Sequence, residues 1–417
     1  MESSASIVLA KHVLLVFGII LALGTFSGLL ARLARVPDVV VFLLVGMLLG
    51  PGVFGLIDIK ADSAVNQLIL IFGSSYILFD GGASIRLKVL KEVWITVTVI
   101  ATIGVLITAA ITGVAAYYIL GVPMIVALLL GAVIASTDPA TLVPVFRQVK
   151  IKERVAQTVM TESAFNDAMG AIVTFAVLGV AMGAGEFSAG DALLDLLKQS
   201  LLGILVGGIL GYLAILLIAH EKYGFLAEYA PVVTLMAVIG AYMSADGLHS
   251  SGFMAVFVFG IMIGNQETFG LRRAHEDEKI LEDYIMTTAL IMRMFIFILL
   301  GAQVDFALMN QYLFAGAAVV VIFMLVARPV TVFLCAGPDR RARWSRNELL
   351  FMCWTRETGV IPGALAGLLL GMKAPGAEII ASVTFIAILM TILIQATTTK
   401  WLAGKLGLLL EQDVAAK

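Results

Sequence analysis

Two neighbouring apolar segments of this chain carry polar residues at their centres. The first segment contains Ser136-Thr137-Asp138-Pro139, and the second contains Thr161-Glu162-Ser163-Ala164-Phe165-Asn166-Asp167. Each segment is long enough to span a lipid bilayer, where lipid offers no partner for a polar group. A proline removes a backbone hydrogen bond and disfavours helix at the residue before it. We therefore expect the first helix to be unwound from Thr137 to Pro139.

The second segment presents its polar residues on one side of a helix. Glu162 and Asn166 are one turn apart, as are Ser163 and Asp167, so two adjacent stripes of the helix are polar. Single polar side chains can simply link membrane helices, but carboxylates inside a membrane segment mark ion pathways or proton relays by default. We expect these oxygens to form a pocket that faces the break. Oxygen ligands of this kind suit small hard cations.

The composition excludes a soluble protein. Of the 417 residues, 61% are hydrophobic and 13% are charged, and the mean hydropathy is +1.04. These values are typical of a polytopic membrane protein. The formal net charge is only −2 and no basic tract occurs, so we expect no nucleic-acid partner.

Apolar runs long enough to cross a membrane define the predicted topology. There are thirteen, at about residues 8–34, 38–55, 65–85, 90–120, 122–147, 153–184, 190–220, 225–246, 250–266, 279–302, 310–335, 347–371 and 376–408. An odd number places the two termini on opposite sides. Lys and Arg concentrate in alternate connections, such as those that hold Arg86, Lys88, Lys91, Arg340 and Arg346. By the positive-inside rule we expect an outside N-terminus and a cytoplasmic C-terminus in the cell membrane.

A second interruption occurs seven spans after the first. It reads Trp354-Thr355-Arg356-Glu357-Thr358-Gly359-Val360-Ile361-Pro362-Gly363. A simple proline kink is the alternative, but the Arg-Glu pair favours a functional break. Paired interruptions in two halves of a chain are typical of inverted-repeat transporters. The sequence thus predicts two inverted six-span units joined by the seventh span.

The charges within the predicted spans do not balance. Three arginines (Arg293, Arg328 and Arg356) accompany five carboxylates (Asp80, Asp138, Glu162, Asp167 and Glu357). Because arginine stays protonated, each can fix one carboxylate as a permanent ion pair. A surplus acid must then hold either a proton or a metal cation, and that alternation is the chemistry of an exchanger.

These motifs resemble the cation–proton antiporters of the sodium/proton exchanger superfamily, in the NhaP-type branch that carries an Asn-Asp pair. The resemblance covers nearly the whole chain. It rests on Thr137-Asp138-Pro139, on Glu162-Ser163 with Asn166-Asp167, and on Arg35-Val36-Pro37-Asp38 followed by Gly46-Met47-Leu48-Leu49-Gly50-Pro51. It also includes Phe79-Asp80-Gly81-Gly82, where the family more often has Glu in place of Asp80.

The resemblance implies the fold and its division. We expect an all-α polytopic membrane protein with about thirteen transmembrane helices, in which broken helices five and twelve cross at the midplane as in the NhaA-like fold. Residues 1–417 would form one transporter unit. Residues 90–184 and 311–408 would form a six-helix transport bundle, and residues 8–85 and 190–302 the interface helices of a homodimer.

The resemblance also implies the site and the activity. Asp167 would be the shared cation and proton site, with Ser163, Glu162 and a Thr137 carbonyl as further Na⁺ ligands. Asn166 would orient the site, and supporting roles fall to Asp138, Asp80, Arg328 and Arg356, with the pairings left open. We expect an electroneutral exchange of one Na⁺ or Li⁺ for one H⁺ by alternating access, surrounded by membrane lipid and without a cofactor.

Three other functions remain as alternatives. A K⁺/H⁺ antiporter would need the same site, and the sequence does not select the ion. An intramembrane aspartyl protease could use Asp138 and Asp167, but the Tyr-Asp and Gly-x-Gly-Asp motifs of such enzymes do not occur around them. A cation channel is not expected to need an exchangeable acid among paired ones. We therefore expect a transporter and not an enzyme.

Overall fold

The computed structural model describes residues 5–34, 36–61, 63–137, 142, 145–146, 149–183, 189–219, 224–270 and 275–410. These residues are helical apart from connections and one isolated β-bridge between Ile151 and Leu409. The all-helical prediction is therefore confirmed for this part of the chain.

In chain order the elements are α1 (Ala5–Ala34), α2 (Asp38–Leu49), α3 (Ala64–Ala83), α4 (Leu87–Val99), η1 (Ile100–Gly104), α5 (Val105–Leu120), α6 (Met124–Ile134), α8 (Glu153–Ala181), α9 (Ala189–Ala219), η2 (Ala227–Tyr229), α10 (Ala230–Gly247), α11 (Gly252–Gly264), η3 (Gln266–Phe269), α12 (His275–Ala302), α13 (Phe306–Ile322), η4 (Phe323–Ala327), α14 (Arg328–Cys335), α15 (Arg346–Trp354), α16 (Val360–Gly371), α17 (Ala377–Met390), η5 (Thr391–Ala396) and α18 (Thr397–Lys405).

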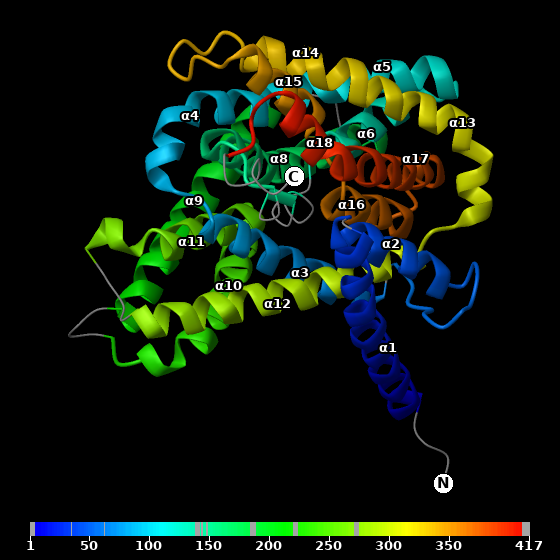
Figure 1. Cartoon of the computed structure of the whole chain (residues 1–417). Coiled ribbons are helices and arrows are strands. Elements are labelled where there is room, and N and C mark those ends of the chain that lie inside the picture. The colour runs from blue at the N-terminus through cyan, green and yellow to red at the C-terminus, as the bar shows by residue number, and fades with distance from the viewer. Residues whose placement is uncertain are drawn as a thin grey trace.

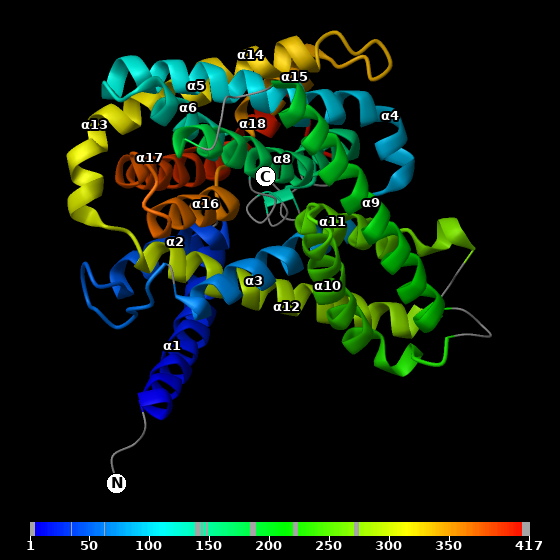
Figure 2. The ribbon, with the colours of Figure 1, turned by 180° about the vertical axis from the view of Figure 1, so that it is seen from behind.

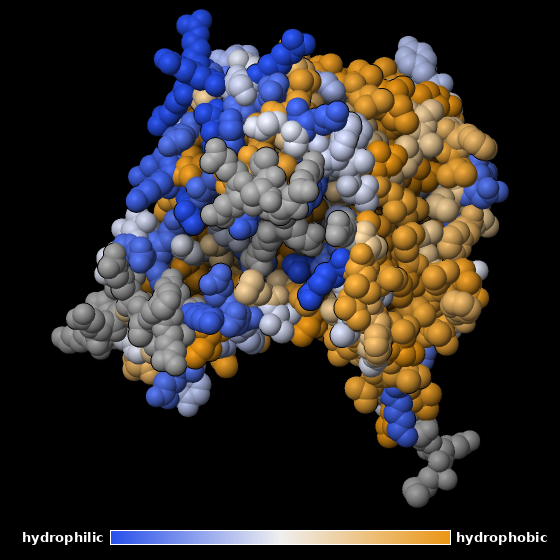
Figure 3. Space-filling model, viewed as in Figure 1, coloured by the Kyte–Doolittle hydropathy of each residue, from blue (hydrophilic) through white to orange (hydrophobic). Residues whose placement is uncertain are grey.

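Membrane-length helices make up most of the described chain. Nine of them are long and apolar enough to cross a bilayer, and four shorter apolar helices (α2, α6, α11 and α16) accompany them. Their bounds follow the predicted apolar runs to within a few residues at most ends. Large apolar side chains cover much of the outer surface, as the broad hydrophobic side of the space-filling view shows (Figure 3). Such a surface is stable against lipid, where no hydrophobic effect opposes its exposure.

The helices gather into two groups in both ribbon views (Figures 1 and 2). In the first group, α5 packs on α6, α6 on α8, and α13 on α17. In the second group, α11 packs on α3, α9 and α10, while α12 packs on α2 and α3. The two groups meet where α8 contacts α3 and α11, and where α16 contacts α3 and α12.

Glycines allow the helices of the second group to cross closely. A Cβ atom at Gly260 would collide with the backbone carbonyl of Phe79, and one at Gly82 would collide with that of Phe257. Gly46 of α2 faces the backbone of α12 in the same way. Close approach of small residues is a main source of stability between membrane helices, because dispersion contacts increase as backbones approach. These crossings hold α3 to α11 and α2 to α12.

The two predicted interruptions are present, with one correction. Helix α6 ends at Ile134, and Thr137 is not helical; Asp138 and Pro139 lie outside the described residues. Helix α15 ends at Trp354 and α16 begins at Val360. The sequence placed Pro362 within the second break, but Pro362 lies in the first turn of α16. A proline is tolerated there because the first N–H groups of a helix have no intrahelical acceptor.

Three long helices contain a π-helical turn near their middle, which the sequence did not predict. These turns are η1 between α4 and α5, η4 between α13 and α14, and η5 between α17 and α18. Turns of this type are rare and are often found at functional sites. Both η4 and η5 contact the second interruption, through Phe323 and Thr391.

The connection between α14 and α15, residues 336–345, is fastened to two other helices. Thr96 of α4 donates a hydrogen bond to Asp339 Oδ2 (2.5 Å) and accepts one from Trp344 Nε1 (2.8 Å). Arg154 of α8 donates to the carbonyl of Ala342 (2.7 Å), and its guanidinium lies over the Trp344 ring. The connection therefore joins the beginning of α8 to that of α15.

Candidate ion-binding site

The first interruption faces α8 directly. The N–H of Thr137 donates to Asn166 Oδ1 (2.9 Å), and Asn166 Nδ2 donates to Thr137 Oγ1 (2.8 Å). Thr137 Oγ1 in turn donates to Ser163 Oγ (2.9 Å). All three side chains are at most 2% exposed. The end of α6 is thus held against α8 by a closed set of hydrogen bonds, which satisfies a backbone group that the break would otherwise leave without a partner.

Asp167 lies beside this contact. It follows Asn166 directly and is one turn after Ser163 on α8, and only 1% of the residue is exposed. A carboxylate buried to this extent is costly as a charge, so its surroundings must compensate that charge. Its neighbours on α8, Ser163 and Asn166, are the residues that contact Thr137.

Glu162 is the partner of Arg328. The two Nη atoms of Arg328 donate to the two carboxylate oxygens of Glu162, at 2.5 and 2.8 Å, and both side chains are at most 1% exposed. Arg328 Nε donates to the carbonyl of Met352 (2.9 Å). Of the acids that the sequence left open for this arginine, the geometry selects Glu162. A two-pronged pair of this kind fixes both groups in charge and position.

The second interruption supplies Arg356 to the other side of the first. Its Nη2 donates to the carbonyl of Ala135, the residue that follows α6, and its guanidinium lies 4.9 Å from the centre of the Phe323 ring. The N–H of Thr358 donates to Thr391 Oγ1 (3.0 Å). The two interruptions therefore contact each other, and η4 and η5 contribute Phe323 and Thr391.

Other charged residues that the sequence singled out lie as follows. Glu357 is fully buried in the second interruption. Asp80 is buried in α3, a helix that packs mainly on α11 and α12. Arg293 of α12 pairs with Asp38 at the start of α2 (3.7 Å), away from the two interruptions. Asp138 lies outside the described residues, so its pairing with either arginine stays a prediction.

Sequence reasoning missed several groups that form this site. The carbonyls of Ala135 and Met352 accept from the two buried arginines, and Phe323 packs under one of them. Backbone acceptors and aromatic packing have no signature in a single sequence. Thr391 could have been recognised in the sequence, because a threonine within a long apolar span must place its hydroxyl against another polar group.

The donor set decides which ions this site can hold. It consists of carboxylate, hydroxyl and amide oxygens, and among the described residues no group of three or more His, Cys, Asp and Glu side chains converges. Such a set suits a small hard cation better than a metal that prefers nitrogen or sulfur. A cation and a proton would each neutralise the same buried carboxylate.

Membrane-length helices, two interrupted helices in contact and a buried carboxylate at their meeting point together define a secondary ion transporter. The chain belongs to the sodium/hydrogen exchanger family, whose transmembrane region matches residues 18–405. It is a multi-pass integral membrane protein.

Two relatives and one solved structure are similar to this chain over most of its length. Na(+)/H(+) antiporter 1 of Methanocaldococcus jannaschii is 34% identical over 361 residues, which cover 84% of this chain and 81% of that protein. The K(+)/H(+) antiporter NhaP of Alkalimonas amylolytica is 28% identical, and the match covers 93% of this chain and 66% of that protein. The structure of the sodium proton antiporter MjNhaP1 from M. jannaschii at pH 8 superposes with a TM-score of 0.77 and 31% identity, covering 95% of this chain and 99% of the other.

Proposed function

We propose that this protein is a secondary antiporter that exchanges Na⁺ or Li⁺ for H⁺ across the membrane. One observation carries the proposal: Asp167 is buried on α8 beside an oxygen-lined break, while the neighbouring acid Glu162 is neutralised by Arg328. In this proposal the Arg328–Glu162 pair is a permanent charge pair, and Asp167 is the acid that exchanges. The names of the relatives support the same activity.

The residues take the following roles in this proposal. Asp167 holds either the cation or the proton, so the two ions compete. Ser163 Oγ, a Thr137 oxygen and a remaining lone pair of Glu162 complete the cation's ligands. Asn166 holds Thr137 through both ends of its amide and so orients the break. Asp138, Asp80 and Arg356 support the site without exchanging a proton.

The finer architecture belongs to the same proposal. Thirteen spans form two inverted repeats, with the interrupted helices five and twelve crossing at the midplane. Residues 90–184 and 311–408 move as one bundle against residues 8–85 and 190–302, and the latter hold two copies together as a homodimer. The site is thereby exposed to each side in turn. The N-terminus is outside the cell membrane and the C-terminus inside.

Exchange of K⁺ for H⁺ is the second candidate. It is favoured by the K(+)/H(+) antiporters among the relatives, one of which matches 93% of this chain. The site would be the same, and only the fit of the cation would differ. Exchange measured with Na⁺, Li⁺ and K⁺ in turn distinguishes the two.

The proposal is tested in proteoliposomes that contain a pH-sensitive dye and carry an imposed pH gradient. Adding Na⁺ should dissipate the gradient with the wild-type protein. Asp167→Asn should abolish this response while the protein remains monodisperse, because the amide cannot exchange a proton. Asp58→Asn, which changes an exposed carboxylate, is the matched control and should retain exchange. Cation-coupled proton movement in well-folded Asp167→Asn would remove Asp167 from the mechanism.

A further inference from the structure

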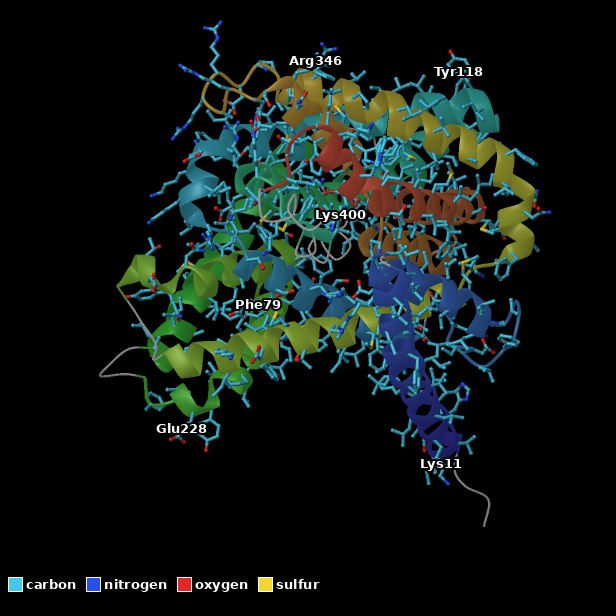
Figure 4. The ribbon with its side chains drawn as sticks, in the orientation of Figure 1. Lys11, Phe79, Tyr118, Glu228, Arg346 and Lys400 are labelled. Atoms are coloured by element: carbon cyan, nitrogen blue, oxygen red, sulfur yellow. The ribbon has the colours of Figure 1, made fainter. Side chains whose placement is uncertain are left out.

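A large cavity lies away from the proposed exchange site, at the end of α1 that carries Arg32. Its volume is about 1070 Å³. Its walls come from the last turns of α1, the start of α2, the middle of α12, the end of η5 and the beginning of α18, with Val145 and Val149 from the chain before α8. Lys400 of α18 lines it, and Figure 4 shows Lys400 far from Lys11, which marks the opposite end of α1. The lining includes none of Thr137, Glu162 and Asp167.

The charges that line the cavity are unequal. Arg32 and Lys400 are cationic, and Asp38 is the acid that faces them. The charge of Asp38 is already compensated, because Arg293 lies 3.7 Å from Oδ2 and the N–H of Val39 donates to Oδ1 (3.0 Å). Among the lining residues that the structure describes, two positive charges therefore remain. A vestibule for entering cations would carry the opposite sign, so the cavity fits an anion.

The uncharged part of the lining is apolar and opens toward the outer surface of α1. Phe26 is 70% exposed and Leu29 is 53% exposed, and both line the cavity. The hydroxyls of Thr25 and Thr397 donate to carbonyls of their own helices, of Leu21 and Leu393. These two hydroxyls therefore need no hydrogen bond from a polar ligand. An occupant of this cavity needs an anionic head and an apolar body.

The geometry points to a binding site for an anionic phospholipid, with its phosphate between Arg32 and Lys400 and its acyl chains along Phe26 and Leu29 of α1. Basic residues at the end of a membrane helix attract anionic headgroups in this way. The bound lipid would contact α1, α2 and α12 on one side and α18 on the other. It would thus lie between α18 and the helices α1, α2 and α12.

The test is native mass spectrometry of the purified full-length protein in detergent, with phosphatidylglycerol and phosphatidylcholine of identical acyl chains. The wild type should bind phosphatidylglycerol in preference. Replacing both cations, in Arg32→Gln with Lys400→Gln, should weaken its binding roughly 30-fold, the loss expected for two basic residues near an anionic headgroup. The charge-retaining double variant, Arg32→Lys with Lys400→Arg, should preserve the binding of phosphatidylglycerol. This variant keeps the test decisive if the charge-neutral double variant folds poorly.

The matched control is Arg346→Gln with Lys405→Gln, which removes the same charge from exposed positions outside the cavity. It should bind phosphatidylglycerol as the wild type does. Equal loss in this control, or equal binding of the two lipids by the wild type, would overturn the proposal. So would full competition by soluble glycerol phosphate, because the site would then recognise a free phosphate. The measurement needs no transport activity, so its outcome is independent of the proposed exchange.

Discussion

Glu162 and Asp167 belong to the same helix, and the proposed exchange assigns them different tasks. Both oxygens of Glu162 accept from Arg328, so this acid has a fixed, charge-assisted partner. Asp167 lies next to Asn166, whose amide is engaged with Thr137. Two substitutions separate the roles of the surrounding residues.

Ser163→Ala should raise the apparent KM for Na⁺ about fivefold while leaving the maximal exchange rate near that of the wild type. The substitution removes a neutral ligand and the acceptor for Thr137 Oγ1, a loss comparable to one hydrogen bond of about 1 kcal/mol. The measurement is the Na⁺ dependence of exchange in proteoliposomes. Ser382→Ala, which removes a hydroxyl bonded to the carbonyl of Leu308, is the control. An unchanged KM in Ser163→Ala would exclude Ser163 as a ligand.

Arg328→Met should reduce the folded yield and the thermal stability strongly. It leaves the buried carboxylate of Glu162 without its cation, and breaking a buried pair in this way costs about 3–5 kcal/mol. Adding Glu162→Gln to Arg328→Met should recover part of that loss, since no net charge then remains. Yield and melting temperature in detergent report both effects. Normal stability with altered ion preference in the single variant would instead place Arg328 at the ion itself.

At the scale of elements, the connection of residues 336–345 links the beginning of α8 to α15. Burial alone would raise the pKa of Asp339. Hydrogen bonds from Thr96 and from the N–H groups of Ala342 and Arg341 outweigh burial and hold that pKa below its ordinary value of 3.8. A carboxylate with a lowered pKa stabilises the folded state above the unfolded pKa, and this contribution is lost as the pH falls through the folded pKa.

Asp339→Asn should therefore destabilise the protein at pH 7, and the difference from the wild type should shrink as the pH falls below about 4. Melting temperatures measured from pH 7 down to pH 3 test this directly. Glu228→Gln, at an exposed position that Figure 4 labels, is the control and should follow the wild-type profile. A gap between Asp339→Asn and the wild type that stays constant over the whole range would contradict the assignment.

The sequence predicted the helices better than the contacts between them. Apolar run lengths located the spans, and Pro139 with its polar neighbours located the first break, because lipid penalises each unsatisfied group locally. The partner of Arg328 was left open. Glu162 is distant from Arg328 in sequence, and no local sequence pattern reports which distant residues come into contact. Asp38 was noted only as part of the Arg35-Val36-Pro37-Asp38 motif and not as the partner of Arg293, with which it pairs. The exchange role of Asp167 came from resemblance and stays a prediction.

At the scale of the whole molecule, the number of exchangeable acids sets the charge moved in each cycle. If Asp167 alone exchanges, one monovalent cation crosses for one proton and no net charge moves. Transfer of one elementary charge through 100 mV is worth about 2.3 kcal/mol, so an electrogenic exchanger would respond strongly to voltage. We expect exchange by this protein to be independent of membrane potential.

The measurement is Na⁺-driven proton movement in proteoliposomes whose potential is clamped at several values with K⁺ and valinomycin. Steady currents on a solid-supported membrane provide a second readout and should be absent. Asp167→Asn liposomes give the leak at each potential. A steady exchange rate that increases with the clamped potential would show net charge movement and require a second exchanging group.

The π turn η4 has a consequence for the helix in which it lies. A π turn contains about one residue more than an α turn, and each residue advances an α-helix by about 100°. Phe323–Ala327 therefore sets the angular phase between α13 and the arginine that begins α14. Deleting one residue from this turn would leave a continuous, fully hydrogen-bonded helix. The guanidinium of Arg328 would then point about a quarter-turn or more away from Glu162. The length of this one turn is thus as much a part of the ion pair as the two side chains that form it.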